Sequence, residues 1–145
     1  MQRGFIVLLL ICVAGCSSYF TPYHSETAPS LESGILLAGT IIIDSKLHKK
    51  IQPSDTLYII AKKGDGMPPL AVKKMAVGAF PLKFELGSQD IMMHGASLEG
   101  DVILVARIDQ DGMAGPPQKG DLEGRTAKPI SIGDQSIEIK IDKSF

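Results

Sequence analysis

The chain contains no tryptophan, and its three tyrosines and five phenylalanines make up only 6% of the residues. A folded interior must therefore be filled mainly by isoleucine, leucine, valine and alanine side chains. Strong charge of either sign is also absent, because 15 basic and 16 acidic residues leave a formal net charge of −1. Nucleic-acid binding needs a clustered basic surface, so we expect no nucleic-acid partner.

Cysteine is nearly absent as well. Cys12 and Cys16 are the only two, and both lie close to the start of the chain. Beyond position 16 the sequence therefore has no means of forming a disulfide, a cysteine-ligated metal site or a thiol–disulfide exchange centre. With 145 residues in all, the chain is long enough for one domain with a single modest core.

The first sixteen residues have the layout of an export signal. Arg3 supplies positive charge, residues 5–14 form a short apolar run, and small residues precede Cys16. A cleavage site of this kind followed by cysteine is typical of a bacterial lipoprotein signal. We predict removal of residues 1–15 by cleavage after Gly15 and attachment of lipid to Cys16. A membrane-spanning helix is the alternative, but the apolar run is about half the roughly 20 residues that a span requires.

Residues 16–33 are predicted to be a tether between the lipid and the domain. They include two prolines and many hydroxyl side chains, without a regular apolar period, which favours an extended linker. The lipid would hold the protein to a membrane of the cell envelope, with the domain facing the periplasm. Aspartate directly after the cysteine retains enterobacterial lipoproteins in the inner membrane. Ser17 stands there instead, which slightly favours the outer membrane.

From position 34 onward the apolar residues recur with a period of two, as they do in half-buried strands. Ile137, Ile139 and Ile141, for example, alternate with charged residues. Residues 35–43 and 102–108 are apolar on both faces, which suits the central strands of a sheet. We predict an all-β fold over residues 34–145, a small antiparallel β-sandwich of about seven strands.

Glycine and proline mark the connections between these strands. KGDG at 63–66 and DG at 111–112 place glycine where a hairpin needs positive φ, so each predicts a hairpin. The proline pairs at 68–69 and 116–117 lack N–H donors and indicate loops or edges. Residues 87–100 form the longest irregular stretch, with room for one helical turn.

The sequence shows no catalytic constellation. It lacks a Gly-x-Ser-x-Gly motif, and its only histidines are His24, His48 and His94. A serine triad needs a histidine beside a serine and a carboxylate, and the spacing does not favour one. Gly64 and Gly66 are followed by Met-Pro-Pro instead of a helix, so they do not form a phosphate-binding loop. We expect a protein that is not an enzyme and uses no cofactor.

The methionines suggest two kinds of contact. Met92, Met93 and His94 are adjacent, and thioether and imidazole groups suit Cu(I), so a copper-handling protein is one hypothesis with these three as weak candidate ligands. Methionine more often fills apolar gaps or contacts an apolar partner. We favour partner contact or packing over metal binding.

Several short segments resemble, in order and spacing, the C-terminal periplasmic domain of the cytochrome c-type biogenesis protein CcmI, also called CycH. The resemblance covers about residues 35–142. The segments that carry it are DTLYIIAK at 55–62, MPPLAVKK at 67–74, FPL at 80–82, DIMM at 90–93, VARI at 105–108, GMA at 112–114 and GDLEG at 120–124. That family domain is immunoglobulin-like, which agrees with the predicted sandwich.

The resemblance implies a binding module in cytochrome c maturation. The family protein holds apocytochrome c and presents it to the haem-ligation machinery, so an apocytochrome c or a haem-ligation subunit is the expected partner of a monomeric domain. This chain departs from the family plan by its missing helical repeats, its lipid anchor and a histidine at 94 where proline is common. A structural or assembly lipoprotein that docks in an envelope complex is therefore the alternative.

Two surfaces are candidates for partner binding. An exposed edge strand near residues 63–70 would accept an extended peptide by main-chain hydrogen bonds. Alternatively, loop residues at one end of the sandwich would form an adaptable apolar patch. The candidate partner-binding residues are Met67, Pro68, Pro69, Met92, Met93, His94 and Met113.

Overall fold

The computed structural model describes residues 34–93 and 98–145 and shows an all-β domain in them. The predicted signal, the tether and His94 lie outside the described residues. The strands are β1 (Ile35–Ile43), β2 (Thr56–Lys62), β3 (Ala71–Ala76), β4 (Leu82–Gly87), β5 (Asp101–Asp109), β6 (Leu122–Arg125), β7 (Ile130–Ser131) and β8 (Ile137–Ser144). Two short 3-10 helices accompany them, η1 (His48–Lys50) and η2 (Ser88–Asp90). No helix in the described part of the chain is long and apolar enough to cross a membrane.

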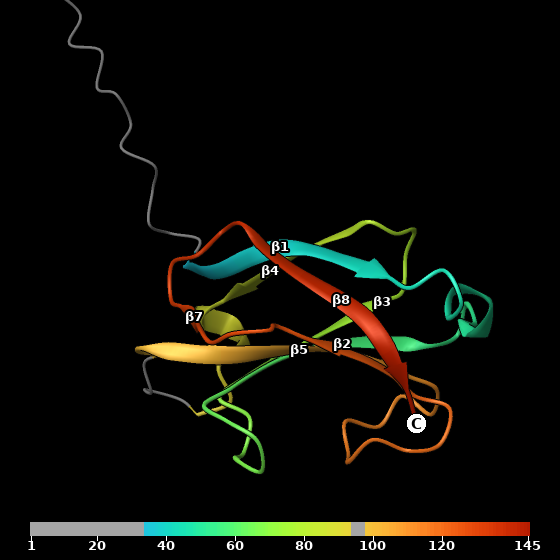
Figure 1. Ribbon diagram of the computed structural model, residues 1–145. Helices are drawn as coiled ribbons and strands as arrows, with labels where there is room; N and C mark the ends of the chain where they lie inside the picture. Colours follow the sequence, from blue (N-terminus) through green and yellow to red (C-terminus); the bar gives the residue numbers. More distant parts are fainter. Residues whose placement is uncertain (1–33, 94–97) are drawn as a thin grey trace, which may run out of the picture. The chain divides into compact units, whose positions relative to one another are not determined.

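The strands form one continuous hydrogen-bonded path in the order β3-β2-β5-β6-β8-β1-β4, and β7 pairs with β5. Neighbours are antiparallel except β1 and β8, which run parallel. The path curls over, so that β1 and β4 face β2 and β5 across the interior (Figure 1). The prediction of a small antiparallel sandwich of about seven strands is confirmed, and the parallel pairing of β1 with β8 is the one departure from it. The two runs that are apolar on both faces, β1 and β5, lie inside the path as predicted.

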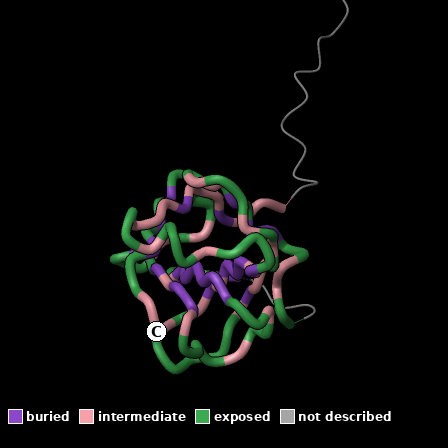
Figure 2. Tube along the Cα trace, turned by 90° about the vertical axis from the view of Figure 1, so that its right-hand side faces the viewer, coloured by how far each residue is buried: buried purple, intermediate pink, exposed green. Residues whose placement is uncertain are grey.

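The core follows the predicted alternation. Leu57, Ile59 and Ala61 of β2 and Ile139 and Ile141 of β8 are completely buried. Figure 2 shows the buried residues gathered in the middle of the domain, with exposed residues in the surrounding loops. Burial of each large aliphatic side chain contributes about 1.5–3 kcal/mol, so an aliphatic core without tryptophan is sufficient for one domain.

The core is self-contained. Leu31–Phe145 forms one compact unit, and all of the core residues lie within it. A domain with its own hydrophobic core and no disulfide to complete is expected to fold by itself. Residues 31–145 are therefore a suitable fragment for binding and stability measurements.

The turns also agree with the sequence. The hairpin between β2 and β3 contains Gly66 at φ +74°, and the connection between β5 and β6 contains Gly112 at φ +73°. Both proline pairs lie in these loops. The irregular stretch after β4 holds the single turn of η2, as expected.

One face of β2 differs from the expectation. Tyr58 alternates with the core residues of β2, so the period of two places it on the opposite face, yet it is only 4% exposed. The loop between β5 and β6 (residues 110–121) lies over it, and the Tyr58 hydroxyl donates a hydrogen bond to the Gly112 carbonyl oxygen at 2.7 Å. The outer face of this layer is therefore partly covered, which creates the hollow described next.

Candidate functional site: a methionine–proline pocket

The four methionines proposed for partner contact are all at the surface. Met67 is 54% exposed, Met92 58%, Met93 68% and Met113 67%. Side chains this exposed do not fill gaps in the core, so packing does not account for these four methionines. Pro68 and Pro69 are exposed beside Met67.

Met67 and Met92 belong to neighbouring segments at one end of the domain. Met67 lies in the loop between β2 and β3 (residues 63–70). The Met92 backbone N–H donates a hydrogen bond to the Leu70 carbonyl oxygen at 2.9 Å, and Ile91 forms a β-bridge with Ala71. The chain itself thus occupies the edge of β3 next to the proline pair. This disfavours addition of a peptide strand at that point and favours the loop surface.

A pocket of about 450 Å³ opens between this loop and the loop of residues 110–121. Its floor is the outer face of β2 and β3, where Ile60 and Val72 pair in register. We call it the methionine–proline pocket. Its main lining residues are Ile60, Val72, Met67, Pro69, Ala114 and Pro116. Met113 precedes Ala114 in the second loop, so the pocket joins two regions that lie far apart in the sequence.

Arg107 holds the second wall of the pocket in place. This largely buried side chain of β5 donates from Nε and Nη2 to Glu123 Oε2 at 3.1 and 2.8 Å. Its Nη1 donates to the Gly115 carbonyl oxygen at 2.7 Å, which ties the loop to the sheet. Sequence reasoning missed this role. The available signal was an arginine within the otherwise apolar run at 102–108.

Three aspartates shape the same loop from its two ends. The Met113 N–H is shared by Asp109 Oδ1 at 3.1 Å and Asp111 Oδ1 at 2.9 Å. Asp121 accepts hydrogen bonds from the backbone N–H groups of Gln110 and Gln118. These bonds give the carboxylates a structural role in folding the loop over β2 and β5.

The pKa values of Asp109 and Asp111 are shifted in opposite directions. Burial raises the pKa of Asp109 above its ordinary value, helped by its hydrogen bond to Asp111 and by the nearby charge of Asp121. The hydrogen bond from the Met113 N–H lowers the pKa of Asp111, and the bond with Asp109 lowers it further. Ionised Asp109 therefore opposes folding, whereas ionised Asp111 supports it.

A protein-family model described as "Cytochrome c-type biogenesis protein H Ig-like domain" matches residues 37–142, which is nearly all of the described domain. The chain belongs to this family. The immunoglobulin-like fold and the family expected from the sequence are both confirmed.

Two relatives are similar to this domain, and they differ in how much of their own length the similarity covers. An uncharacterized protein of Aquifex aeolicus is 32% identical over 149 aligned positions, which cover 99% of this chain and 97% of that protein. The cytochrome c-type biogenesis protein CycH of Pseudomonas aeruginosa is 31% identical over 109 positions, which cover 73% of this chain. The match covers only 26% of CycH. No solved structure matches the chain significantly.

Some of the predicted site residues lie outside the part of the chain that the structure describes. Gly15, Cys16 and His94 lie outside the described residues, so cleavage, lipidation and the copper hypothesis stay predictions. Within residues 34–93 and 98–145, no three histidine, cysteine, aspartate or glutamate side chains are grouped to hold a metal ion. Met92 and Met93 are the members of the proposed copper set that the structure places, and both are exposed.

Replacing Arg107 should loosen the loop that walls the pocket. Arg107→Ala leaves Glu123 and the Gly115 carbonyl oxygen without their partner, so we expect the free energy of unfolding to fall by about 2–4 kcal/mol. Arg125→Ala is the matched control. Arg125 pairs with exposed Asp65 at 3.0 Å, and such pairs contribute about 1 kcal/mol or less. Urea unfolding of residues 31–145 measures both, and equal losses would contradict the assigned role.

The aspartates should respond to pH in opposite directions. Because the Asp109 pKa is raised from 3.8 in the folded state, its ionisation weakens the fold as pH rises through the folded pKa. The stability of Asp109→Asn relative to wild type should therefore increase between about pH 4 and pH 7. Because the Asp111 pKa is lowered, Asp111→Asn should be the less stable protein at pH 7 and approach wild type below about pH 4. Urea unfolding at a series of pH values tests both signs, and parallel curves would contradict the assignment.

Proposed function

We propose that this chain is a lipid-anchored, non-catalytic binding module that acts in cytochrome c maturation. The observation that carries the proposal is the family match over residues 37–142, together with a relative that bears the name of cytochrome c-type biogenesis protein CycH. The expected partner is an apocytochrome c or a haem-ligation subunit in the periplasm. Because the match covers only 26% of CycH, the activity of that whole protein is not transferred.

The methionine–proline pocket is the surface that we assign to the partner. Its floor is apolar, and the two cations in its lining are already paired, Arg107 with Glu123 at 2.8 Å and Lys62 with Asp65 at 3.9 Å, so an uncharged side chain fits it best. Met67 in its lining, and Met113 next to the lining residue Ala114, are unbranched and able to repack against different apolar side chains. A haem-free cytochrome polypeptide exposes apolar segments that the folded protein buries, which matches such a surface.

A structural or assembly role in an envelope complex is the second candidate. It is favoured by the Aquifex aeolicus relative, since the alignment covers 97% of that protein. This domain therefore recurs in a protein of similar length as well as within the much longer CycH. The two candidates differ in whether the partner is an unfolded cytochrome or a folded envelope protein.

A direct binding measurement distinguishes the maturation role from the structural or assembly role. Residues 31–145 should bind haem-free cytochrome c polypeptide in reducing buffer and should not bind the folded, haem-containing protein, as measured by surface plasmon resonance. Met67→Ser combined with Met113→Ser should weaken binding by about tenfold, because each replacement removes apolar contact area. Lys128→Ser, on an exposed residue outside the pocket lining, is the control and should leave binding unchanged. Equal binding of both cytochrome forms, or of neither, would contradict the assignment of an apocytochrome as the partner.

Lipid attachment is tested in cells that express the full chain. Cys16→Ser should abolish incorporation of radiolabelled palmitate and release the protein from the membrane fraction. Cys12→Ser should do neither, because Cys12 leaves with the signal. Separation of inner and outer membranes on a sucrose gradient then tests the preference for the outer membrane. Retention of the label by Cys16→Ser would refute the anchor.

A further inference from the structure

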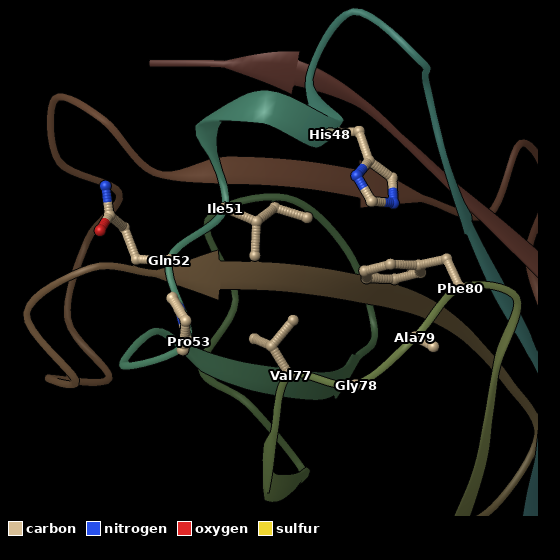
Figure 3. Close-up of a pocket in the computed structure, with 8 residues that line it drawn as sticks. All are labelled: His48, Ile51, Gln52, Pro53, Val77, Gly78, Ala79 and Phe80. Atoms are coloured by element: carbon tan, nitrogen blue, oxygen red, sulfur yellow. The ribbon is translucent and has the colours of Figure 1, made fainter.

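A second pocket lies at the end of the domain where β1, β3 and β5 finish. The connection from β1 to β2 and the connection from β3 to β4 enclose a hollow of about 420 Å³ (Figure 3). Gly34, where the described chain begins, lies at the other end of β1, about 30 Å away along the strand. The pocket is thus at the opposite end from the point where the chain enters the domain.

The interior of this pocket is apolar. Ile51, Val77 and Phe80 point toward one another in Figure 3, and each is only partly buried while it packs against the core. The His48 ring stands edge-on to the Phe80 ring, with centroids 6.2 Å apart and planes at 76°. The exposed parts of these side chains offer one side of an apolar contact, with space for an apolar side chain from outside.

Three lysines lie close to this pocket along the chain, because Lys49 and Lys50 stand between the lining residues His48 and Ile51, and Lys46 stands two positions before His48. Lys46, Lys49 and Lys50 surround His48 in the sequence, and all four residues are exposed. The Lys50 ammonium donates to the neutral Ser144 hydroxyl at 2.9 Å, so this bond leaves its charge uncompensated. In the described part of the chain, no ion pair involves Lys49 or Lys50.

The two acidic residues of the connection between β1 and β2 are already engaged with other groups. Asp44 lies 3.6 Å from Lys140 and also accepts a hydrogen bond from the Lys46 backbone N–H. Asp55 is buried and accepts a hydrogen bond from the Gln52 N–H at 2.8 Å. An apolar hollow next to a short helix that carries lysines without ion pairs is complementary to a ligand that joins an apolar group to negative charge.

We propose that this end pocket, formed by His48, Ile51, Val77 and Phe80, binds an acidic segment of a partner protein that inserts one large apolar side chain. The side chain lies between Ile51 and Val77 and against Phe80, and the flanking carboxylates face Lys49 and Lys50. The interaction is separate from the methionine–proline pocket, and it allows the domain to hold two partners at once. An anionic membrane would be attracted by the lysines alone and would not require the hollow.

The test uses residues 31–145 and a fluorescein-labelled peptide with one phenylalanine flanked by three glutamates on each side. Fluorescence anisotropy should show saturable binding that weakens with added salt. Replacing the phenylalanine by alanine, or the glutamates by glutamines, should each weaken binding by about tenfold or more. Backbone amide signals of residues 46–53 and 77–80 should shift in NMR spectra, and those of the methionine–proline pocket should not.

Charge reversal provides the matched variants. Lys49→Glu combined with Lys50→Glu should weaken peptide binding by about tenfold or more, whereas Lys128→Glu should leave it unchanged. All three residues are exposed, so the fold should survive, and circular dichroism checks this. The proposal is overturned by absent peptide binding, by equal binding of the glutamine peptide, or by shifts confined to residues around Met67 and Met113. Binding to anionic phospholipid vesicles without binding to the peptide would overturn it in favour of a membrane surface.

Discussion

Burial of both faces of β5 is the constraint on which the rest of this structure depends. Its inner face packs Leu104, Ala106 and Ile108 into the core, and its outer face presents Arg107 beneath the loop that follows it. Arg107 is acceptable there because Glu123 and the Gly115 carbonyl oxygen satisfy its guanidinium group. The same bonds fold the loop over β2 and so create one wall of the methionine–proline pocket. Stability and the proposed binding surface thus share one buried arginine.

The two pockets have different chemistry and lie on different parts of the domain. The methionine–proline pocket is flanked by flexible thioethers, which suits apolar segments of varied sequence. The end pocket is apolar inside and lies next to a short helix that carries lysines without ion pairs, which suits a partner of defined charge. A domain with both surfaces would be able to hold an unfolded client and remain attached to a folded component of a maturation complex. This arrangement needs no catalytic group, in keeping with the binding role proposed from the family.

Local sequence patterns were a good guide to the strands and a poor guide to what covers them. The alternation in β2 and β8 predicts which side chains enter the core, because strand side chains point to opposite faces with a period of two. Gly66 and Gly112 likewise predict their turns from backbone sterics alone. The burial of Tyr58 does not follow from the alternation, because it depends on a loop more than 50 positions away, which the neighbours of Tyr58 in the sequence do not encode. The end pocket was missed because His48 and Phe80 lie in different connections, far apart in the sequence, and meet only in the tertiary structure.

The sequence by itself determined the all-β class, the central position of β1 and β5, the two hairpin turns and the family. These features follow from side-chain periodicity, glycine conformations and ordered segments, all of which are local along the chain. Only the tertiary structure decided that β3 and β4 end the strand path, that Met67 and Ala114 share a pocket, and that Arg107 joins β5 to Gly115. Such contacts arise when the sheet curls and brings distant loops together. Their geometry depends on the summed packing of many side chains, so no short stretch of sequence specifies it.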